Sequence, residues 1–301
     1  MSIRGRIRVL HLISTLDAGG AEMSLSRLAS SMDPDRFENH VVNMIRPGAV
    51  GRALESKGVP VSSLNMEKGR PDPRAVLRLR FTTSLVRPDI VQCWMYHANL
   101  LGLALMKPAR TLWGIRCSDM DLSSYGPLYR FTVKAGARLS PLPRGIVVNS
   151  LAGREAHGRL GFCPREWIHI PNGFDTDAFR PVADARARVR AELGIPGNSF
   201  VVGLVARLDP MKGLDTFFRA AGLFLKRHPA AHAVLAGRGL SGDDPWIAGQ
   251  IEASHAARLH FLGERPDIPD LLNAFDIASS SSLSEGLPNA VGEAMASGLP
   301  C

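Results

Sequence analysis

Two cations with a fixed spacing are the first residues whose chemistry stands out. Arg207 and Lys212 lie five residues apart in segment 203–213, which follows a short apolar run and precedes a helical pattern. A planar guanidinium and a compact ammonium beside a helix N-terminus suit a diphosphate group. If the pair stood alone, two solvated cations on a surface loop would be the better interpretation.

Two carboxylates, Glu285 and Glu293, follow farther along the chain, eight residues apart with a turn between them. We expect Glu285 before a helix and Glu293 about two turns into it. Carboxylate oxygens only accept hydrogen bonds and can bind neighbouring sugar hydroxyls. The same pair could act as the acid and base of glycoside hydrolysis, which needs one raised pKa and a fixed separation. Glu293 alone also fits an ordinary exposed helix acid.

A glycine loop, residues 17–22, lies between the first apolar run and the first helical pattern. Gly19 and Gly20 would let backbone amides approach a phosphate at the helix N-terminus. A tight strand-to-helix turn explains the same glycines without a ligand. The loop is not the GxGxxG fingerprint, which disfavours a dinucleotide-dependent dehydrogenase.

The elements that must position these residues alternate between short apolar strands and helical patterns. This alternation of strands and helices predicts an α/β fold with parallel sheets covered on both faces. The first set of strands is expected at 7–13, 40–44, 61–64, 89–93, 111–115 and 145–149, with helices that include 21–31, 50–57, 73–86 and 97–106. After turn-forming residues at 170–173 the alternation restarts, with strands at 200–205, 231–236, 259–262 and 276–279 and helices at 212–228, 245–254, 268–274 and 287–297.

We therefore expect two doubly wound, Rossmann-like domains: residues 1–170, a hinge at 171–183, and residues 184–301. Ligands of such folds bind at the carboxyl ends of the strands, here in a cleft between the domains.

The composition excludes several classes of protein. With 45% hydrophobic and 21% charged residues, the chain is globular rather than disordered.

The charge is distributed unevenly along the chain. Residues 1–180 carry 25 basic and 15 acidic side chains (net +10), and residues 181–301 carry 11 basic and 13 acidic side chains (net −2). The basic half fits a nucleic acid, an anionic lipid or a phosphorylated acceptor, or simply a solvated basic face. Nucleic acid is disfavoured because the acidic half holds the best-defined motifs. Four scattered cysteines and no apolar run long enough to span a bilayer point to a cytoplasmic protein, with membrane contact at most peripheral.

Together the motifs resemble glycosyltransferase family four, whose members are retaining, nucleotide-sugar-dependent enzymes of the GT-B fold. The resemblance covers essentially the whole chain and rests on the Arg207/Lys212 and Glu285/Glu293 pairs and on segments 19–22, 170–175, 237–239 and 261–269. Segments 94–100 and 114–116 are similar to a branch that makes bacterial surface polysaccharides. The Glu285/Glu293 pattern disfavours an epimerase or phosphorylase of the same shape.

The resemblance implies a role for each matching residue. Arg207 and Lys212 would hold the donor diphosphate, Glu285 would contact hydroxyls of the transferred hexose-type sugar, and Glu293 would bind the ribose. The remaining donor-binding residues would be Gly286, Leu287, Pro288 and Asn289 at sugar and phosphate, Gly237, Glu264 and Arg265 beside the base, and Gly19 and Gly20 over the diphosphate.

One position departs from the family pattern. Many relatives have a histidine after the fifth strand, where this chain has Arg116, which we assign to the acceptor side. His97, after the fourth strand, then becomes the candidate that orients the acceptor, although it also fits a helix-terminal histidine without catalytic duty. The DxD patterns Asp119/Asp121 and Asp175/Asp177 imitate a metal motif of another glycosyltransferase fold. The resemblance implies no essential metal and no cofactor beyond the donor substrate.

The stretch 68–87 interleaves arginines with apolar residues and leaves its role open. Arg74, Arg78 and Arg80 alternate with Leu77, Leu79 and Phe81. As a helix, it would either lie on anionic lipid near a lipid-linked acceptor or pack its apolar side on the first sheet with its arginines in water.

The chain length, 301 residues, shapes the functional hypothesis. Relatives of this family continue with a further strand, which residues 298–301 would enter, and a terminal helix. We therefore expect a C-terminally truncated second domain and a poorly supported donor site. The function predicted is transfer of a hexose-type sugar to a glycan or lipid-linked acceptor in surface polysaccharide synthesis. The alternative is a catalytically impaired fragment that at most binds nucleotide.

Overall fold

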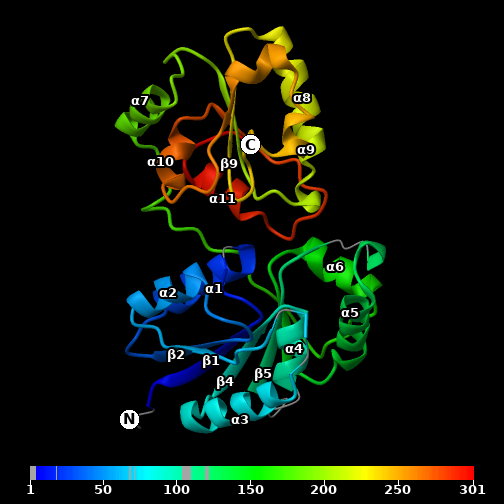
Figure 1. The fold of residues 1–301 in the computed structure, drawn as a ribbon. Coiled ribbons are helices and arrows are strands. Elements are labelled where there is room, and N and C mark those ends of the chain that lie inside the picture. Colours follow the sequence, from blue (N-terminus) through cyan, green and yellow to red (C-terminus); the bar gives the residue numbers. More distant parts are fainter. Residues whose placement is uncertain (1–4, 18, 68, 71, 104–109, 119–121) are drawn as a thin grey trace. The chain divides into compact units, whose positions relative to one another are not determined.

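The chain divides into two compact units, Met1–Gly173 and Phe174–Cys301, and the boundary falls inside the segment expected to be the hinge (Figure 1). The structure, a computed structural model, describes residues 5–17, 19–67, 69–70, 72–103, 110–118 and 122–301. Each unit is an α/β layer structure with its own sheet and its own core.

The first unit is built on a seven-stranded sheet in the order β3-β2-β1-β4-β5-β6-β7. Every pair of neighbours is parallel, so the carboxyl ends of all strands meet at one edge. The strands are β1 (Ile7–Ile13), β2 (Phe37–Asn43), β3 (Val61–Ser63), β4 (Ile90–Trp94), β5 (Thr111–Ile115), β6 (Gly145–Val148) and β7 (Trp167–His169). The sequence pattern did not predict β7, which has only three residues.

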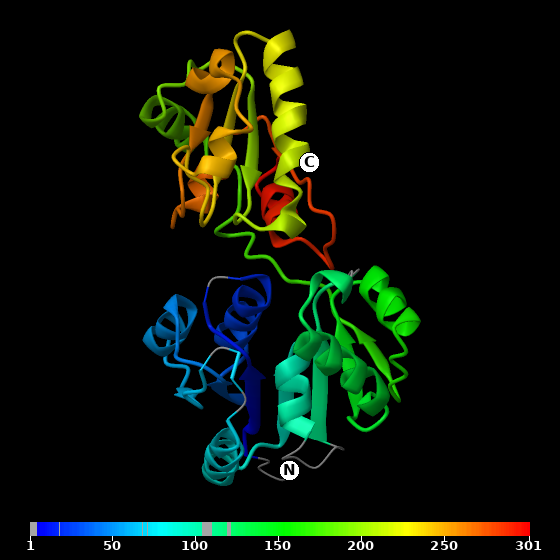
Figure 2. The ribbon, with the colours of Figure 1, turned by 45° about the vertical axis from the view of Figure 1, so that its right-hand side comes forward.

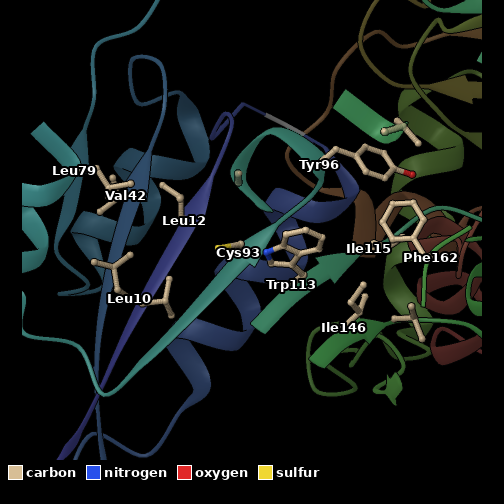
Figure 3. Close-up of a cluster of buried hydrophobic side chains, with 14 of the residues drawn as sticks. Leu10, Leu12, Val42, Leu79, Cys93, Tyr96, Trp113, Ile115, Ile146 and Phe162 are labelled. Atoms are coloured by element: carbon tan, nitrogen blue, oxygen red, sulfur yellow. The ribbon is translucent and has the colours of Figure 1, made fainter. Parts of the chain in front are cut away.

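Helices cover both faces of this sheet because consecutive strand residues point to opposite sides. Leu12 belongs to one apolar cluster, shared with α3, α4 and α5, while Ile13 belongs to another, shared with α1 and α2. Figure 3 shows the first cluster, with Leu10, Leu12 and Cys93 beside Trp113, Ile115 and Ile146. The helices are α1 (Gly20–Ser31), α2 (Ala49–Ser56), α3 (Arg74–Val86), α4 (Tyr96–Leu103), α5 (Pro127–Leu139) and α6 (Leu151–Arg159), with a 3-10 turn, η2 (Leu122–Ser124).

The second unit repeats the architecture on a smaller parallel sheet, ordered β10-β9-β8-β11 (Figure 2). Its strands are β8 (Val201–Val205), β9 (His232–Ala236), β10 (Leu259–Phe261) and β11 (Ile277–Ser279). Helix α8 (Leu214–Arg227) packs on one face; α7 (Ala183–Glu192), α10 (Ile268–Asn273) and α11 (Asn289–Ala296) pack on the other. The shorter elements are α9 (Pro245–Ala248) and the 3-10 turns η3 (Pro210–Lys212) and η4 (Ala253–Arg258).

Three predicted helices in this unit differ from the structure. The helix expected at 212–228 begins only at Leu214, because Gly213 has a positive φ of 56° and separates it from η3. The helix expected at 245–254 is two short pieces, α9 and η4. Helix α11 begins at Asn289, so Glu293 lies one turn into the helix and not two. Residues 298–301 run beside β11 as expected, since the Ala278 amide donates to the Pro300 carbonyl at 2.9 Å, but they are not assigned as a strand.

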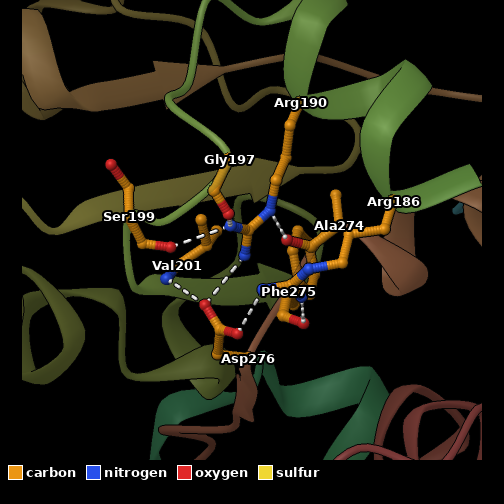
Figure 4. A network of polar contacts seen from close by, with 8 residues as sticks. All are labelled: Arg186, Arg190, Gly197, Ser199, Val201, Ala274, Phe275 and Asp276. Carbon is orange, nitrogen blue, oxygen red and sulfur yellow. Dashed lines mark hydrogen bonds and ion pairs between the residues drawn. The ribbon is translucent and has the colours of Figure 1, made fainter.

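A buried arginine fixes the start of two of these strands (Figure 4). Arg190 of α7 is 1% exposed and donates to the carbonyls of Gly197, Ser199 and Ala274. It also pairs with Asp276, whose carboxylate in turn accepts from the Val201 amide at 2.7 Å. The network therefore joins α7 to the residues from which β8 and β11 begin.

Candidate functional site

The predicted donor residues meet at the carboxyl edge of the second sheet. Each of the four strands is followed by at least one of them: Glu264 follows β10, Gly237 follows β9, Arg207 and Lys212 follow β8, and Glu285 follows β11. Because the strands are parallel and ordered β10-β9-β8-β11, these segments lie next to one another in that order along one edge.

The centre of this arrangement is an ion pair between Lys212 and Glu285. The Lys212 ammonium donates to Glu285 Oε1, which also accepts from the Ser282 hydroxyl at 2.9 Å. Both side chains are largely buried, with exposures of 23% and 26%. The Ser281 hydroxyl donates to the Lys212 carbonyl at 2.8 Å, which ties the two loops together. A cation and a carboxylate, 73 residues apart in sequence, are thus held in one place.

Arg207 lies on the same loop and is oriented by Asp209. Its guanidinium contacts the Asp209 carboxylate at 2.8 and 2.9 Å, and the other Asp209 oxygen accepts from the Met211 amide. Burial alone would raise the pKa of Asp209, but the Met211 amide and the Arg207 charge outweigh it and hold that pKa below its usual range. Asp209 therefore stays ionised and fixes both Arg207 and the turn that carries Lys212.

Two glycines allow the loops to approach this closely. At Gly213 a Cβ would lie 2.2 Å from the Ser281 carbonyl oxygen, and at Gly237 it would lie 1.8 Å from the Ala206 carbonyl oxygen. Both have positive φ, 56° and 144°. Only glycine fits such positions. The glycine predicted beside the nucleotide base thus has a packing duty of its own.

Helix α11 begins at the same edge and carries Glu293. The preceding segment, Gly286 to Pro288, turns the chain from β11 into the helix. Pro288 at the N-cap has no side-chain oxygen to accept from the first amides, and the helix N-terminus bears partial positive charge. Gly292 lets the helix lie against Phe174, since a Cβ there would be 2.0 Å from that ring.

The two charged residues predicted beside the base differ in their surroundings. Glu264 is exposed. Arg265 is bound to two carboxylates, Asp267 and Glu192 of α7, and its side chain is only 18% exposed. These partners raise the pKa of Arg265, with Asp267 contributing most. The geometry favours an anchoring duty for Arg265 that its position in the motif did not indicate.

The candidate residues of the first unit also follow strand ends. Gly19 and Gly20 follow β1 and begin α1, and the Glu22 carboxylate folds back toward Gly19, 2.3 Å from where a Cβ would be. His97 and Arg116 follow the adjacent strands β4 and β5.

Arg116 is held by residues that the sequence did not single out as ligands. Its guanidinium lies 4.5 Å from the centre of the Trp94 ring and donates to the Asn172 side-chain oxygen. Asn149 donates to the same oxygen at 3.4 Å. Burial, followed by the charge of Arg27, lowers the pKa of Arg116 to about 10. The cation therefore persists at neutral pH, stacked and oriented. Trp94, Asn149 and Asn172 each stand at or just beyond the end of a strand, which is the signal that would have found them.

His97 is half-buried at the start of α4, with its ring 5.6 Å from that of Tyr129. Burial lowers its pKa, so the imidazole is neutral at physiological pH. Met95, two residues earlier, has a positive φ of 69°, a strained value for a residue with a side chain. This left-handed residue lies between the end of β4 and the start of α4 at Tyr96.

Only one of the two DxD patterns lies in the part of the chain that the structure describes. Asp119 and Asp121 lie outside the described residues. Asp175 instead accepts from the amides of Asp177 and Ala178, which stabilises a local turn. In the described part of the chain no three His, Cys, Asp or Glu side chains come together as metal ligands.

The fold and the site define a class: two parallel-sheet units, one of which carries a cation–carboxylate site at its strand ends. Models of known families match both units. Residues 18–178 match Glycosyltransferase Family 4, and residues 199–301 match the glycosyl transferases group 1. EpsF of Bacillus subtilis (strain 168), assigned as a glycosyltransferase, is 35% identical over 312 residues, covering 98% of this chain and 78% of EpsF. The chain therefore belongs to glycosyltransferase family 4, as its motifs predicted.

Further relatives agree with this assignment. The Escherichia coli UDP-Gal:alpha-D-GlcNAc-diphosphoundecaprenol alpha-1,3-galactosyltransferase is 37% identical over 134 residues, which cover 44% of this chain and 35% of that enzyme. The crystal structure of Anabaena HepE with UDP-glucose superposes with a TM-score of 0.80 at 25% identity, over 98% of this chain and 79% of HepE. Sucrose-phosphate synthase from Thermosynechococcus elongatus shares the fold at a TM-score of 0.75 and 17% identity, over 97% of this chain and 80% of that one. The GT-B fold predicted from the sequence is confirmed.

Proposed function

We propose that this chain transfers a hexose-type sugar from a nucleotide-diphosphate sugar to a glycan or lipid-linked acceptor during cell-surface polysaccharide synthesis. The observation that carries the proposal is the Lys212–Glu285 pair at the edge of the second sheet, because it places a cation suited to a diphosphate beside a carboxylate suited to sugar hydroxyls. Among the similar proteins, HepE was crystallised with UDP-glucose, and the Escherichia coli relative acts on a galactosyl nucleotide and a diphosphoundecaprenol-linked acceptor.

In this proposal the second unit binds the donor. Lys212, Arg207 and the N-terminus of α11 stabilise the negative charge that grows on the leaving diphosphate, each contributing about 10²–10³ in rate. Glu285 accepts hydrogen bonds from hydroxyls of the transferred sugar, and Glu293 from those of the ribose. The nucleotide base lies toward Gly237 and Glu264.

The reaction exchanges one bond at the sugar for another. The bond between the anomeric carbon and the diphosphate oxygen breaks, and an acceptor hydroxyl oxygen bonds to the same carbon. We propose attack on the face that the leaving group departs from, which retains the configuration. The proton of the acceptor hydroxyl passes to the departing phosphate oxygen, so no protein base, metal or cofactor is invoked.

The first unit holds the acceptor in this scheme. Arg116 is a fixed cation and His97 a neutral imidazole at neighbouring strand ends, and we propose that the loop with Gly19 and Gly20 takes part in binding the diphosphate. We place the reaction in the cytoplasm, because a reducing compartment keeps cysteines unpaired. The four cysteines, Cys93, Cys117, Cys163 and Cys301, are free thiols.

The test separates donor binding from transfer. We expect Lys212→Ala to lower the rate of sugar transfer by at least about 100-fold. The same variant should also bind UDP more weakly. Glu285→Gln keeps the side-chain volume and removes the charge next to Lys212, so it should lower transfer by a similar factor while UDP binds at least as tightly as before. Lys226→Ala, at an exposed lysine in the last turn of α8, is the matched control.

Transfer is measured with a panel of labelled nucleotide sugars, and UDP binding by calorimetry. Near-normal transfer in both site variants would refute the assignment of the site. UDP binding without transfer from any donor in the panel would instead favour the nucleotide-binding alternative.

A further inference from the structure

Helix α3 has two apolar faces, and only one of them is used by the core. Ala75 and Leu79 are 1% exposed and pack against the first sheet. Leu77, Phe81 and Leu85 are 67%, 65% and 67% exposed. The packing interpretation of this stretch is thus correct for one side of the helix, and a second apolar side remains in solvent.

The exposed residues form a continuous stripe. Leu77, Phe81 and Leu85 are spaced four residues apart, so each is rotated by about 40° from the last and the three lie along one face. Leu79 and Ala75 point to the opposite side. Single exposed apolar residues are ordinary, but three large ones in a row mark a surface with a partner.

The charged side chains of the helix itself are all positive. Arg74, Arg80 and Arg87 are exposed on or beside this face, and residues 74–87 contain no acidic side chain. The whole first unit, residues 1–173, has 24 basic and 13 acidic residues, a net charge of +11, against 12 and 15 (net −3) for residues 174–301.

Helix α5 repeats this pattern on the same face of the sheet. Val133 and Ala137 are buried in the apolar cluster that includes Ala75 and Leu79 of α3. On its outer side Leu128 and Phe131 are 53% and 67% exposed. Arg130, Lys134 and Arg138 are exposed around them, and residues 127–139 have no acidic side chain.

We propose that the outer faces of α3 and α5 bind a bilayer that contains anionic lipid. Leucine and phenylalanine side chains would enter the boundary between headgroups and acyl chains, while the arginines would remain at the lipid phosphates. The proposed contact is with the surface of the bilayer; within the described residues no helix is long and apolar enough to cross it. The contact does not depend on the identity of the donor or the acceptor.

Arg78 is not part of this surface, although its place in the sequence suggests it. Its guanidinium donates to the Leu64 carbonyl and pairs with Asp72 at 3.0 Å. Replacing it would loosen α3 from the sheet, so a test that includes Arg78 would confuse lipid binding with folding.

The experiment is sedimentation of the intact chain with vesicles of phosphatidylcholine containing phosphatidylglycerol, and with vesicles of phosphatidylcholine alone. The triple variant Arg74→Gln/Arg80→Gln/Arg87→Gln should bind the anionic vesicles on the order of 100-fold more weakly, about fivefold per arginine. Leu77→Ser/Phe81→Ser/Leu85→Ser should lose at least about tenfold. Leu128→Ser/Phe131→Ser tests the part played by α5.

The matched control is Leu151→Ser/Leu223→Ser, which removes leucines that are 62% and 63% exposed on α6 and α8. Equal loss of binding in the control, or unchanged binding in the α3 variants, would overturn the proposal. Failure of the wild-type chain to sediment with either type of vesicle would also overturn the proposal. A change of sedimentation coefficient in the α3 apolar variant, with vesicle binding unchanged, would assign the stripe to a protein partner or second copy instead.

Discussion

Replacement of Arg190 by methionine is the sharpest test of how the second unit is built. Methionine keeps most of the length and apolar volume of the side chain but donates no hydrogen bond. The change removes the donors to the carbonyls of Gly197, Ser199 and Ala274, all at 2.8–2.9 Å, and the ion pair with Asp276 at 2.8 Å.

The size of the effect follows from burial. The Arg190 side chain is 2% exposed, so water cannot easily replace the lost partners. Breaking a buried pair by removing one member typically costs about 3–5 kcal/mol. Asp276 is 22% exposed and keeps its bonds to Arg186 and the Val201 amide, which argues for the lower end, about 3 kcal/mol. The matched control is Arg186→Met, whose side chain is 40% exposed and pairs with the same carboxylate, so we expect about 0.5–1 kcal/mol.

The dependence on pH has a definite sign. Burial by itself would raise the pKa of Asp276, but Arg186, the Val201 amide and Arg190 outweigh it and lower that pKa below its unfolded value. The stabilisation is therefore fully present above the unfolded pKa of about 3.9 and is lost as the pH falls through the lower, folded-state pKa. The Arg190→Met variant should lose less stability over this acidic range than the wild type.

Hydrogen exchange measured by mass spectrometry suits a chain of two units, because it reports β8 and β9 separately from the first sheet. We expect protection of these strands to fall by the full 3 kcal/mol (about 150-fold) in Arg190→Met, with the first unit unchanged. Equal losses in Arg190→Met and Arg186→Met, or a loss below about 1 kcal/mol in the former, would show that burial does not set the strength of this network.

Two further predictions concern the candidate sites. Gly237→Ala places a Cβ against the Ala206 carbonyl at a φ of 144°, so UDP binding measured by calorimetry should fall about tenfold or more; wild-type affinity would show that the close approach is dispensable. Arg116→Lys keeps the charge but loses the planar contact with Trp94 and the directed bond to Asn172, so the acceptor KM should rise about tenfold while the donor KM is unchanged; an altered donor KM alone would move Arg116 to the other substrate.

The positions of most strands along the chain, and the candidate residues that follow them, could be predicted from sequence because they depend on local signals. A short apolar run followed by a turn predicts a strand end, and Arg207 and Glu285 both follow such runs. In a parallel sheet all of these ends share one edge, so proximity follows from topology. The pairing of Lys212 with Glu285 was not predictable, because the order of β8 and β11 in the sheet is set by packing on both faces.

Other features depend on helical phase and on tertiary partners, which the pattern alone does not show. Helix α7 reads Ala-Asp-Ala-Arg-Ala-Arg-Val-Arg-Ala-Glu, and nothing local distinguishes the buried Arg190 from the exposed Arg188. On α3, Leu79 is buried and Leu77 is exposed because of the way the helix is rotated about its own axis when it packs on the sheet. Arg265 belongs to a motif by sequence, yet its guanidinium is bound by Asp267 and Glu192.

The ion pair at the centre of the site also bears on what the proposed enzyme would prefer to bind. Lys212 and Glu285 neutralise each other, so a ligand that takes only the lysine must leave the carboxylate with an unmatched charge in a largely buried place. A free nucleoside diphosphate does this, whereas an intact donor offers phosphate oxygens to Lys212 and sugar hydroxyls to Glu285 at once. Part of the free energy of binding would therefore be available only to the whole donor. Once the sugar has left for the acceptor, the pair can re-form, and this favours release of the nucleotide product.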